Sequence, residues 1–426
     1  MTAVAADRVE SAAHALGLAH ELAAEFAEGA ADRDRDRILP HHEVDRLAAS
    51  GLLAITVPAA HGGADLPPSL VAEVAWVLAA ADPNIAQIPH SHFVYLNLLR
   101  LAGTEEQRAR WFGQVLDGAR IANAQSERGG ATVTDIATTV RPDGSGFLLQ
   151  GAKYYCTGSL FAQILAVLTR LDDPDGTSGL DAGEYVLFLP ADAPGVRIVD
   201  DWDGMGQRTT GSGTVTFDSV SVDRDQLIPR AAAVNAPTGY GAYAQLLHAA
   251  IDTGIARGAL TAAVDFVRHS SRPWFEAGVD RAIDDPLVIQ RFGELSVQVT
   301  AADAALVVAG AAVDAAVQAT NPPPDPRDID STGVASAALA DTGEDPGAAA
   351  SVAVAAAKVL ADRAANEVSS ALFEVGGTRS AANATNLHHF WRNARTHTLH
   401  DPVRWKYQHI GRALLHGEAP PRHGVF

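Results

Sequence analysis

The spacing of apolar residues changes twice along the chain, and this order restricts the fold more than any other feature. From residue 5 to about 118 the apolar positions recur at the intervals of amphipathic helices. From Ile121 to about Pro229 they alternate with polar residues or form short runs between turn residues, which indicates strands. Helical spacing returns at Gly239. The sequence therefore predicts an α+β fold with an N-terminal helical domain over 1–118, a central β domain over 119–229 and a C-terminal helical bundle over 230–426.

One segment interrupts the last helical region. Residues 321–347, NPPPDPRDIDSTGVASAALADTGEDPG, are rich in Pro, Asp and Gly and predict a long, flexible surface loop. A chain of 426 residues is long enough for two or three domains, because a single hydrophobic core stops growing at roughly 250–300 residues. Helices on both sides of a β domain also predict an interface that can hold a flat ligand.

The charge balance argues against one class of partner. The chain has 51 acidic and 32 basic residues and a formal net charge of −19, whereas proteins that follow a phosphate backbone concentrate Lys and Arg. We therefore set aside binding to nucleic acids and to anionic membranes.

Three features predict a cytoplasmic location. The N-terminal residues lack a basic segment followed by an apolar run, so they do not resemble a secretory signal. The alanine-rich run at 301–319 contains aspartates, and no segment has the composition expected of a membrane span. The single cysteine, Cys156, cannot form an internal disulfide, which fits a reducing compartment.

The segment RNARTHTLHDP at 392–402 concentrates groups that can carry chemistry. Its histidines, His397 and His400, are three residues apart and share a helix face, so they could bind a metal. Asp401 is adjacent to His400 and points off that face, which weighs against a metal site. A solvated, purely structural pair is a second interpretation. We favour acid/base or hydrogen-bonding chemistry, because imidazole both donates and accepts protons near neutral pH.

The glycine-rich segment GMGQRTTGSG at 204–213 lacks the spacing of a dinucleotide fingerprint and does not open a helix after a strand. The sequence GxxxxGK[ST] is also absent. The sequence therefore argues against a dinucleotide bound in a Rossmann crevice.

Taken together and in order, several motifs resemble the acyl-CoA dehydrogenase superfamily over residues 15 to 415. They are ANAQSERGG at 122–130, GAKYYCTG at 151–158, WDGMGQRTTGSGTVTFDSVSV at 202–222, SRPW at 271–274 and FEVGGTRS at 373–380. The segment FWRNARTHTLHDPVRWKY at 390–407 resembles more narrowly the flavin-dependent monooxygenase branch, which includes dibenzothiophene monooxygenase and the sulfone oxidoreductases of sulfur acquisition. The resemblance implies a helical domain, a β-barrel or sandwich domain and a helical bundle.

The resemblance leaves the reaction to be chosen between two classes. In the dehydrogenases a Tyr-Glu-Gly pattern supplies the glutamate that abstracts the α-proton of an acyl thioester, and here the same place holds His400-Asp401-Pro402. A base must reach its proton, and Asp401 is one methylene shorter than glutamate. This argues against an acyl-CoA dehydrogenase that contains FAD and uses Asp401 as base, without excluding it. A catalytically silent flavin-binding relative is a further alternative.

The monooxygenase branch implies a two-component system. A separate reductase supplies FMNH2, this chain binds it and forms a C4a-(hydro)peroxyflavin with O2, and one oxygen atom passes to a small organic substrate, with a sulfur compound as one candidate. By resemblance His400 stabilises the oxygen adduct, with His397 and Asp401 as orienting neighbours. Further pocket positions match the family at His92, Asn123, Thr157 and Ser212, and Tyr155 and Trp202 would wall the flavin.

Two arginine motifs are expected to hold the flavin phosphate, since Arg makes planar, bidentate phosphate contacts. They are Arg272, followed by Trp274, in SRPW and Arg379 in GGTRS, and the second is expected to reach the flavin of a neighbouring subunit. A shared cofactor implies an oligomer, and the superfamily is usually a homotetramer. The substrate pocket is expected to be lined by the loops around 128–140 and 231–245.

Overall fold

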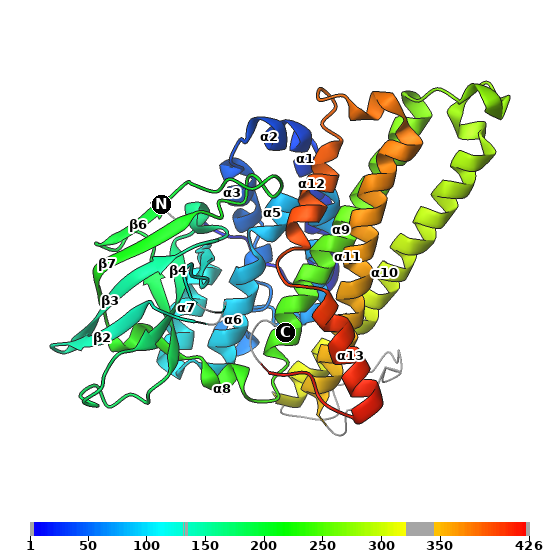
Figure 1. The fold of residues 1–426 in the computed structure, drawn as a ribbon. Coiled ribbons are helices and arrows are strands. Elements are labelled where there is room, and N and C mark those ends of the chain that lie inside the picture. Colours follow the sequence, from blue (N-terminus) through cyan, green and yellow to red (C-terminus); the bar gives the residue numbers. More distant parts are fainter. Residues whose placement is uncertain (1–3, 131, 133–134, 321–344, 423–426) are drawn as a thin grey trace.

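The computed structural model describes residues 4–130, 132, 135–320 and 345–422. The chain folds into seven N-terminal helices, a mixed sheet and a C-terminal bundle of long helices, in the order that the sequence predicts (Figure 1). The N-terminal helices are α1 (Ala12–Ala27), α2 (Ala30–Asp36), α3 (His41–Ala49), α4 (Pro68–Ala81), α5 (Pro83–Gln87), α6 (His90–Ala102) and α7 (Glu105–Leu116).

The α+β fold class is confirmed. The strands are β1 (Ile121–Ala124), β2 (Thr139–Asp143), β3 (Gly146–Lys153), β4 (Ile164–Leu171), β5 (Glu184–Pro190), β6 (Val196–Val199), β7 (Thr214–Val222) and β8 (Leu227–Pro229). They form one eight-stranded sheet in the order β6-β7-β3-β2-β4-β5-β8, with β1 parallel to β4. The C-terminal helices are α8 (Ala231–Val234), α9 (Tyr240–His269), α10 (Pro286–Thr320), α11 (Pro346–Gly376), α12 (His388–His397) and α13 (Arg404–His416). The predicted loop at 321–347 lies outside the described residues, except for its last three positions.

Local sequence signals set several of these boundaries. Thr104 and Gln107 form a capping box at the start of α7, which satisfies two main-chain N–H groups that would otherwise lack partners. The turn between β2 and β3 needs a positive φ, and Gly144 supplies it at +59°. Asp345 caps α11, and Pro346 follows at the position where a missing N–H costs nothing.

Strands β4 and β5 are apolar on both faces because they are buried on both faces. Ile164, Ala166 and Leu168 of β4 pack into the core formed with the N-terminal helices. Leu165 and Val167 point the other way, into a separate core within the β domain. The sheet is thereby fixed against α6 and α7, so the loops at its edge keep a defined position relative to the bundle.

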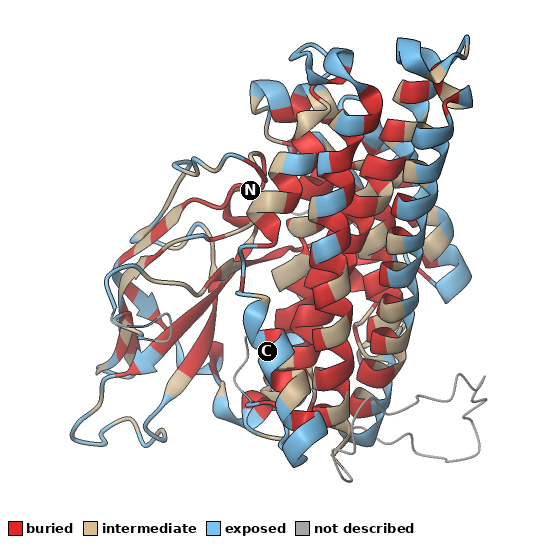
Figure 2. Ribbon diagram, turned by 45° about the vertical axis from the view of Figure 1, so that its right-hand side comes forward, coloured by how far each residue is buried: buried red, intermediate tan, exposed pale blue. Residues whose placement is uncertain are grey.

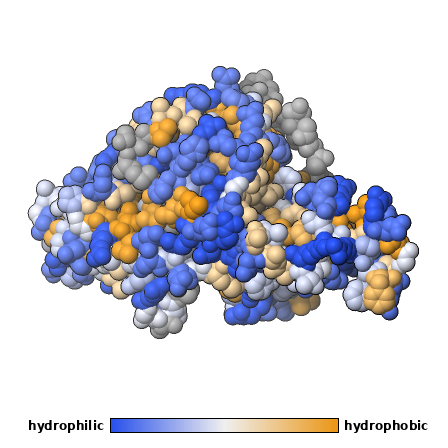
Figure 3. Space-filling view, turned by 90° about the horizontal axis from the view of Figure 1, so that it is seen from above, coloured by the Kyte–Doolittle hydropathy of each residue, from blue (hydrophilic) through white to orange (hydrophobic). Residues whose placement is uncertain are grey.

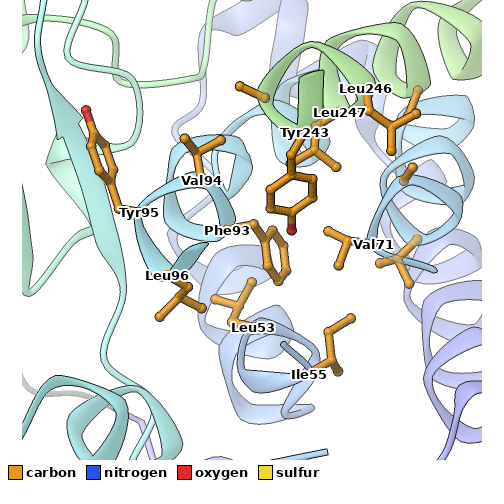
Figure 4. Close-up of a cluster of buried hydrophobic side chains, with 14 of the residues drawn as sticks. Leu53, Ile55, Val71, Phe93, Val94, Tyr95, Leu96, Tyr243, Leu246 and Leu247 are labelled. Carbon is orange, nitrogen blue, oxygen red and sulfur yellow. The ribbon is translucent and has the colours of Figure 1, made fainter. Parts of the chain in front are cut away.

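The largest core lies where α4, α6 and α9 meet. Figure 4 shows Phe93 of α6 and Tyr243 of α9 pointing toward each other between Val71 of α4 and Leu53, while Tyr95 points away toward the sheet. Helix α9 is buried along most of its length, and buried residues run through the long helices of the bundle (Figure 2). Its contact with α4 is close because Gly254 faces α4, where an added Cβ would lie 2.6 Å from the carbonyl oxygen of Trp76.

Helix α10 is long and apolar enough, by length and composition alone, to cross a membrane. It nevertheless carries acidic groups whose partners lie inside the molecule. Trp76 of α4 donates to Asp303 at 3.1 Å, and the main-chain N–H of Ser69 donates to Asp314 at 2.9 Å. These contacts fit a helix that packs on α4 and α11 as part of a protein core.

Candidate active site

His400 lies in the turn between α12 and α13 and forms the accessible end of a stack of imidazole rings. Its side chain is 43% exposed, and its ring centroid lies 3.9 Å from that of His248 on α9. His90, at the start of α6, stacks on His248 with the same 3.9 Å between ring centroids. Three distant parts of the chain thus bring three imidazoles together, and two of them are not among the residues that the sequence predicts.

Burial keeps the two inner rings of this histidine stack neutral. It lowers the pKa of His90 to about 3 and the pKa of His248 well below its usual value. The Nε2–H of His90 donates to the carbonyl oxygen of Ala244 at 2.9 Å, which leaves Nδ1 as an acceptor. At neutral pH each inner ring can therefore donate on one nitrogen and accept on the other.

His397 faces the interior, although it is only three residues from His400. Its Nε2 lies 3.1 Å from Nδ1 of His248, and its Nδ1 lies 2.6 Å from a carboxylate oxygen of Asp252. The two histidines therefore do not converge on a common point where a metal could bind. Within the described part of the chain, no group of three or more His, Cys, Asp or Glu side chains has an arrangement that could hold a metal ion.

Asp401 is buried and paired with a lysine. A carboxylate oxygen lies 2.8 Å from Nζ of Lys406, and the Asp401 side chain is 2% exposed. Burial alone would raise the pKa of Asp401, but His400, Lys358 and Lys406 outweigh burial and hold that pKa below its usual value. An ionised carboxylate that is held this firmly is a weak base, which disfavours proton abstraction from a substrate.

His92 has both ring nitrogens bonded to the main chain. Its Nε2–H donates to the carbonyl oxygen of Leu53 at 2.7 Å, and its Nδ1 accepts from the N–H of Ile121 at 3.0 Å. Burial lowers the pKa of His92 to about 4. This geometry leaves neither nitrogen free for a ligand and ties α6 to the first residue of β1, two positions before Asn123.

Asn123 belongs to a polar cluster between β1 and the loop after β3. The hydroxyl of Tyr95 lies 3.3 Å from Oδ1 of Asn123, and Nδ2 of Asn123 donates to the carbonyl oxygen of Tyr155 at 3.4 Å. The side chain of Asn123 therefore helps to set the position of Tyr155.

Thr157 and Ser212 form a row of hydroxyl groups whose direction is fixed. Thr210 donates to the carbonyl oxygen of Gln207 at 2.9 Å, and Ser212 lies 2.7 Å from Thr210 and 2.8 Å from Thr157. Since a carbonyl can only accept, Ser212 donates to Thr210, and Thr157 donates to Ser212. The oxygen of Thr157, at the accessible end of the row, is left to accept a hydrogen bond from a ligand.

Tyr155 and Trp202 lie edge to face beside this row, with ring centroids 6.1 Å apart. Tyr155 is 47% exposed and has φ of +58°, an uncommon conformation for a residue with a side chain. The indole N–H of Trp202 donates to the carbonyl oxygen of Gln207 at 2.7 Å. The side-chain amide of Gln207 is buried and has no hydrogen-bond partner among the described residues, so it is available to a bound molecule.

The β-domain loops are docked onto the same helix that leads to the histidines. The N–H of Gln207 donates to Oδ1 of Asn393 on α12 at 2.6 Å. Gly158 packs against the carbonyl oxygen of Ile88, two residues before His90, and an added Cβ would lie 3.1 Å from it. The structure therefore brings together Tyr155, Thr157, Trp202 and Ser212 and places them next to the elements that carry the histidine stack.

Arg272, Trp274 and Arg379 lie at the opposite end of α9. Arg379 donates to the carbonyl oxygen of Ser270 at 3.0 Å, just beyond the last residue of α9. His269 is 21 residues beyond His248 on α9, which corresponds to ~32 Å along the helix axis at 1.5 Å per residue. Arg272 and Arg379 are both exposed, and Figure 3 views this end of the molecule from above, with apolar patches among hydrophilic side chains.

Sequence reasoning missed His90, His248 and Asp252 for different reasons. His90 and His92 occur together in HSHF, and the local sequence does not say which of them faces α9. His248 and Asp252 are four residues apart, which places them on one helix face, and this spacing was the available signal.

Three family models match consecutive parts of the chain. They are the N-terminal, middle and C-terminal domains of acyl-CoA dehydrogenase, at residues 17–119, 122–220 and 246–405.

Relatives that match nearly the whole chain indicate which branch of this family it resembles. A dibenzothiophene monooxygenase of Rhodococcus qingshengii is 32% identical over an alignment of 416 residues, which covers 95% of this chain and 94% of that protein. A probable FMNH2-dependent monooxygenase, SfnC, of Pseudomonas putida is 31% identical, over 95% of this chain and 96% of that one. The FMN-bound crystal structure of TdsC from Paenibacillus sp. A11-2 superposes with a TM-score of 0.86 at 31% identity, over 97% of this chain and all of that one. The chain therefore belongs to the acyl-CoA dehydrogenase family and, within it, to the flavin-dependent monooxygenase branch that contains dibenzothiophene monooxygenase.

Proposed function

We propose that this chain is an FMNH2-dependent monooxygenase that transfers one oxygen atom from O2 to the sulfur of a small organic substrate. Relatives named for this chemistry cover nearly the whole chain at 31–32% identity. The observation that carries the proposal is the state of Asp401. A dehydrogenase needs a free carboxylate base at this place, whereas Asp401 is buried and ion-paired with Lys406.

The residues of the β-domain loops fit a flavin. Tyr155 and Trp202 offer aromatic surface for its flat ring system, and Thr157 and Gln207 offer free hydrogen-bonding groups for its polar edge. When bound, reduced flavin supplies the two electrons that activate O2. Acceptance by Thr157 suits the N–H groups of a reduced flavin.

His400 is the member of the histidine stack that can meet a substrate, because its side chain is 43% exposed while His248 is buried. Its imidazole can donate a hydrogen bond to negative charge that develops on oxygen and can hand over a proton. The inner histidines, His90 and His248, are uncharged and do not have to be hydrated. They therefore offer hydrogen-bonding groups without drawing water into the site.

The positions of Arg272 and Arg379 support a site shared between subunits. Both lie ~30 Å along α9 from His248, whereas only a five-carbon ribityl chain joins the flavin ring to its phosphate. These arginines would therefore bind the phosphate of a flavin held by a neighbouring subunit, with Trp274 beside it. A homotetramer is the assembly we propose. A flavin reductase would have to work in the same compartment, because FMNH2 is oxidised rapidly by free O2, and we place both in the cytoplasm.

The test is oxygenation with reduced flavin as the only source of electrons. The purified chain is mixed with FMNH2, which a generic reductase regenerates, and with thioethers, sulfones, sulfinates, amines and phenols under 18O2. We expect one 18O atom in a sulfur-containing product. If 18O is found only in products of the amines or phenols, the atom that accepts oxygen is nitrogen or carbon and not sulfur. Bleaching of bound flavin by acyl-CoA, lost in Asp401→Asn, would replace the proposal with the dehydrogenase.

A further inference from the structure

A row of hydrogen-bonded titratable groups leads from the histidine stack into the core of the bundle. His248 Nδ1 lies 3.1 Å from His397 Nε2, and His397 Nδ1 lies 2.6 Å from Asp252. The second carboxylate oxygen of Asp252 accepts from Lys358 Nζ at 2.8 Å. All four side chains are at most 2% exposed, so water does not compete for these bonds.

With Asp252 ionised, the hydrogen bonds that join His248, His397 and Asp252 allow two arrangements of protons. The carboxylate of Asp252 accepts, so the proton between it and His397 resides on Nδ1 of His397. In the first arrangement His397 Nε2 is bare and accepts from Nδ1–H of His248, whose own Nε2 is then bare. In the second, His397 Nε2–H donates to Nδ1 of His248, and the proton of His248 is on Nε2.

One proton converts the first arrangement into the second. It binds to Nε2 of His248, the Nδ1–H bond of His248 breaks, and that proton forms an N–H bond with Nε2 of His397. The net change is one added proton, with the positive charge on His397 and none on His248. No electrons move, and the reverse sequence returns the proton to the stack.

The surroundings favour the charge on His397. Asp252 lies directly against it, whereas burial, the neighbouring histidines and Lys358 oppose a charge on His248. Lys358 and its second partner Asp362 come from α11. His397 and Lys358 together outweigh burial and hold the pKa of Asp252 below its usual value. The other titratable groups around the pair are His90 of α6, His400 and Asp401 of the turn after α12, and Lys406 of α13.

We propose that His248, His397 and Asp252 form a proton relay that takes up a proton at Nε2 of His248, stores it on His397 and returns it. Asp252 is the positioning residue, since it fixes which nitrogen of His397 carries the permanent proton. The role in turnover rests on the proposed function, but the relay itself is a property of the protein without flavin.

The relay is tested first by 15N NMR of the flavin-free protein labelled at histidine, which shows which ring nitrogens carry protons. As the pH falls we expect His248 to change from its Nδ1–H to its Nε2–H form in the same step in which His397 becomes doubly protonated. Asp252→Asn should uncouple the two changes, because an amide can donate as well as accept, and Asp252→Glu should preserve them. Independent titration of the two rings in the native protein would overturn the relay.

Turnover supplies the second test. His248→Gln, which keeps a polar side chain but cannot relay, should lower kcat ~100-fold while KM and the Kd for FMNH2 stay unchanged. His389→Gln, at a buried histidine of α12 outside the relay, is the matched control and should retain kcat. A native kcat in a correctly folded His248→Gln protein contradicts a role in turnover. If instead the native protein oxygenates nothing while the coupled NMR step is present, the proposed function fails and the relay stands.

Discussion

At the scale of single residues, the site separates two histidines that look equivalent in the sequence. His400 lies at the surface of the stack, while His397 is enclosed by His248 and Asp252. The turn that follows α12 causes the difference, because it takes His400 off the helix before a full turn is complete. Substitutions at the two positions should therefore have different effects.

The first prediction concerns His400. His400→Ala removes the side chain that we propose donates to the reacting oxygen, and loss of one preorganised donor typically lowers the rate by about 10²–10³. Product formation should fall by this factor while FMNH2 consumption continues, with the missing oxygen recovered as hydrogen peroxide. A peroxide assay and product chromatography measure both. His416→Ala, at an exposed histidine of α13, should behave as the native protein. If His400→Ala converts the same fraction of the consumed FMNH2 into product as the native protein does, the proposed role of His400 is wrong.

The second prediction concerns the pH dependence of stability. Pairing with His400, Lys358 and Lys406 keeps the pKa of Asp401 below its value in the unfolded chain, against the effect of burial. Its contribution is therefore complete above the unfolded pKa of about 4 and is lost as the pH falls through the folded pKa. Asp401→Asn should cost about 3 kcal/mol of unfolding free energy at pH 7. Urea unfolding should show that the difference in unfolding free energy between the native protein and Asp401→Asn becomes smaller below pH 4. A difference that does not change with pH would contradict the ion pairing of Asp401.

At the scale of elements, close packing of α4 on α9 holds the N-terminal domain to the bundle. Gly254 and Gly258 are one helical turn apart on α9, and both face the main chain of α4. Neither contact leaves room for a side chain. Helix α6 and its His90 are carried by the same N-terminal unit, so this packing also sets the distance between His90 and His248.

The third prediction compares two glycines in long helices. A methyl group at Gly258 would collide with the carbonyl oxygen of Ala80, so Gly258→Ala should lower the unfolding free energy by about 1–3 kcal/mol. An added Cβ at Gly293 in α10 would have no described atom within 4 Å, and Gly293→Ala should raise the unfolding free energy by about 0.5–1 kcal/mol through helix propensity. Thermal unfolding of both variants measures these changes. If the two substitutions change the unfolding free energy in the same direction, close packing at Gly258 does not explain its effect.

Much of the architecture follows from local pattern, whereas the histidine stack does not. The change from helical to strand periodicity near Ile121 is visible in the sequence because alternate faces of a strand have different surroundings. His248 offers no such signal, since α9 is buried nearly all round and its partner His397 is 149 residues away. His90 and His92 are two residues apart on a helix and point in different directions, so helix rotation decides which ring meets His248. The assignment of His92 as a catalytic residue stays a prediction, and its geometry favours a structural role.

At the scale of the whole molecule, the arginines lie at the C-terminal end of α9, whereas the histidine stack meets the N-terminal third of that helix. A site that needs both groups must combine two subunits.

In the fourth prediction, Arg272→Ala and Arg379→Ala should each weaken FMNH2 binding by about 1.5–3 kcal/mol, the range for hydrogen bonds to charged groups. Arg268→Ala, at an exposed arginine of the same helix end, is the matched control.

The fifth prediction uses mixed oligomers. Subunits with Arg379→Ala and subunits with His400→Ala are co-expressed with different affinity tags, and the mixed assemblies are isolated. Each mixed pair should contain one site with native Arg379 and native His400, so activity should recover to about half of the native value per pair. If both residues served the same chain, every site would carry one defect and the mixture would remain as inactive as its parents. Size exclusion confirms that the assemblies are intact.

Two aspartates of α10 affect how that helix is rotated about its axis and aligned against α4. An apolar helix can rotate about its own axis at little cost, because each of its faces suits a core equally well. Asp303 and Asp314 are eleven residues apart, close to three turns, so they share a face, and their partners Trp76 and Ser69 follow in reverse order along α4. Asp314 also stands at the N-terminus of α4, where Pro67 provides no side-chain cap and a negative charge meets the positive end of the helix dipole. These two polar contacts thus favour one rotation of α10 and one antiparallel alignment of α10 with α4, which the apolar surface alone would not specify.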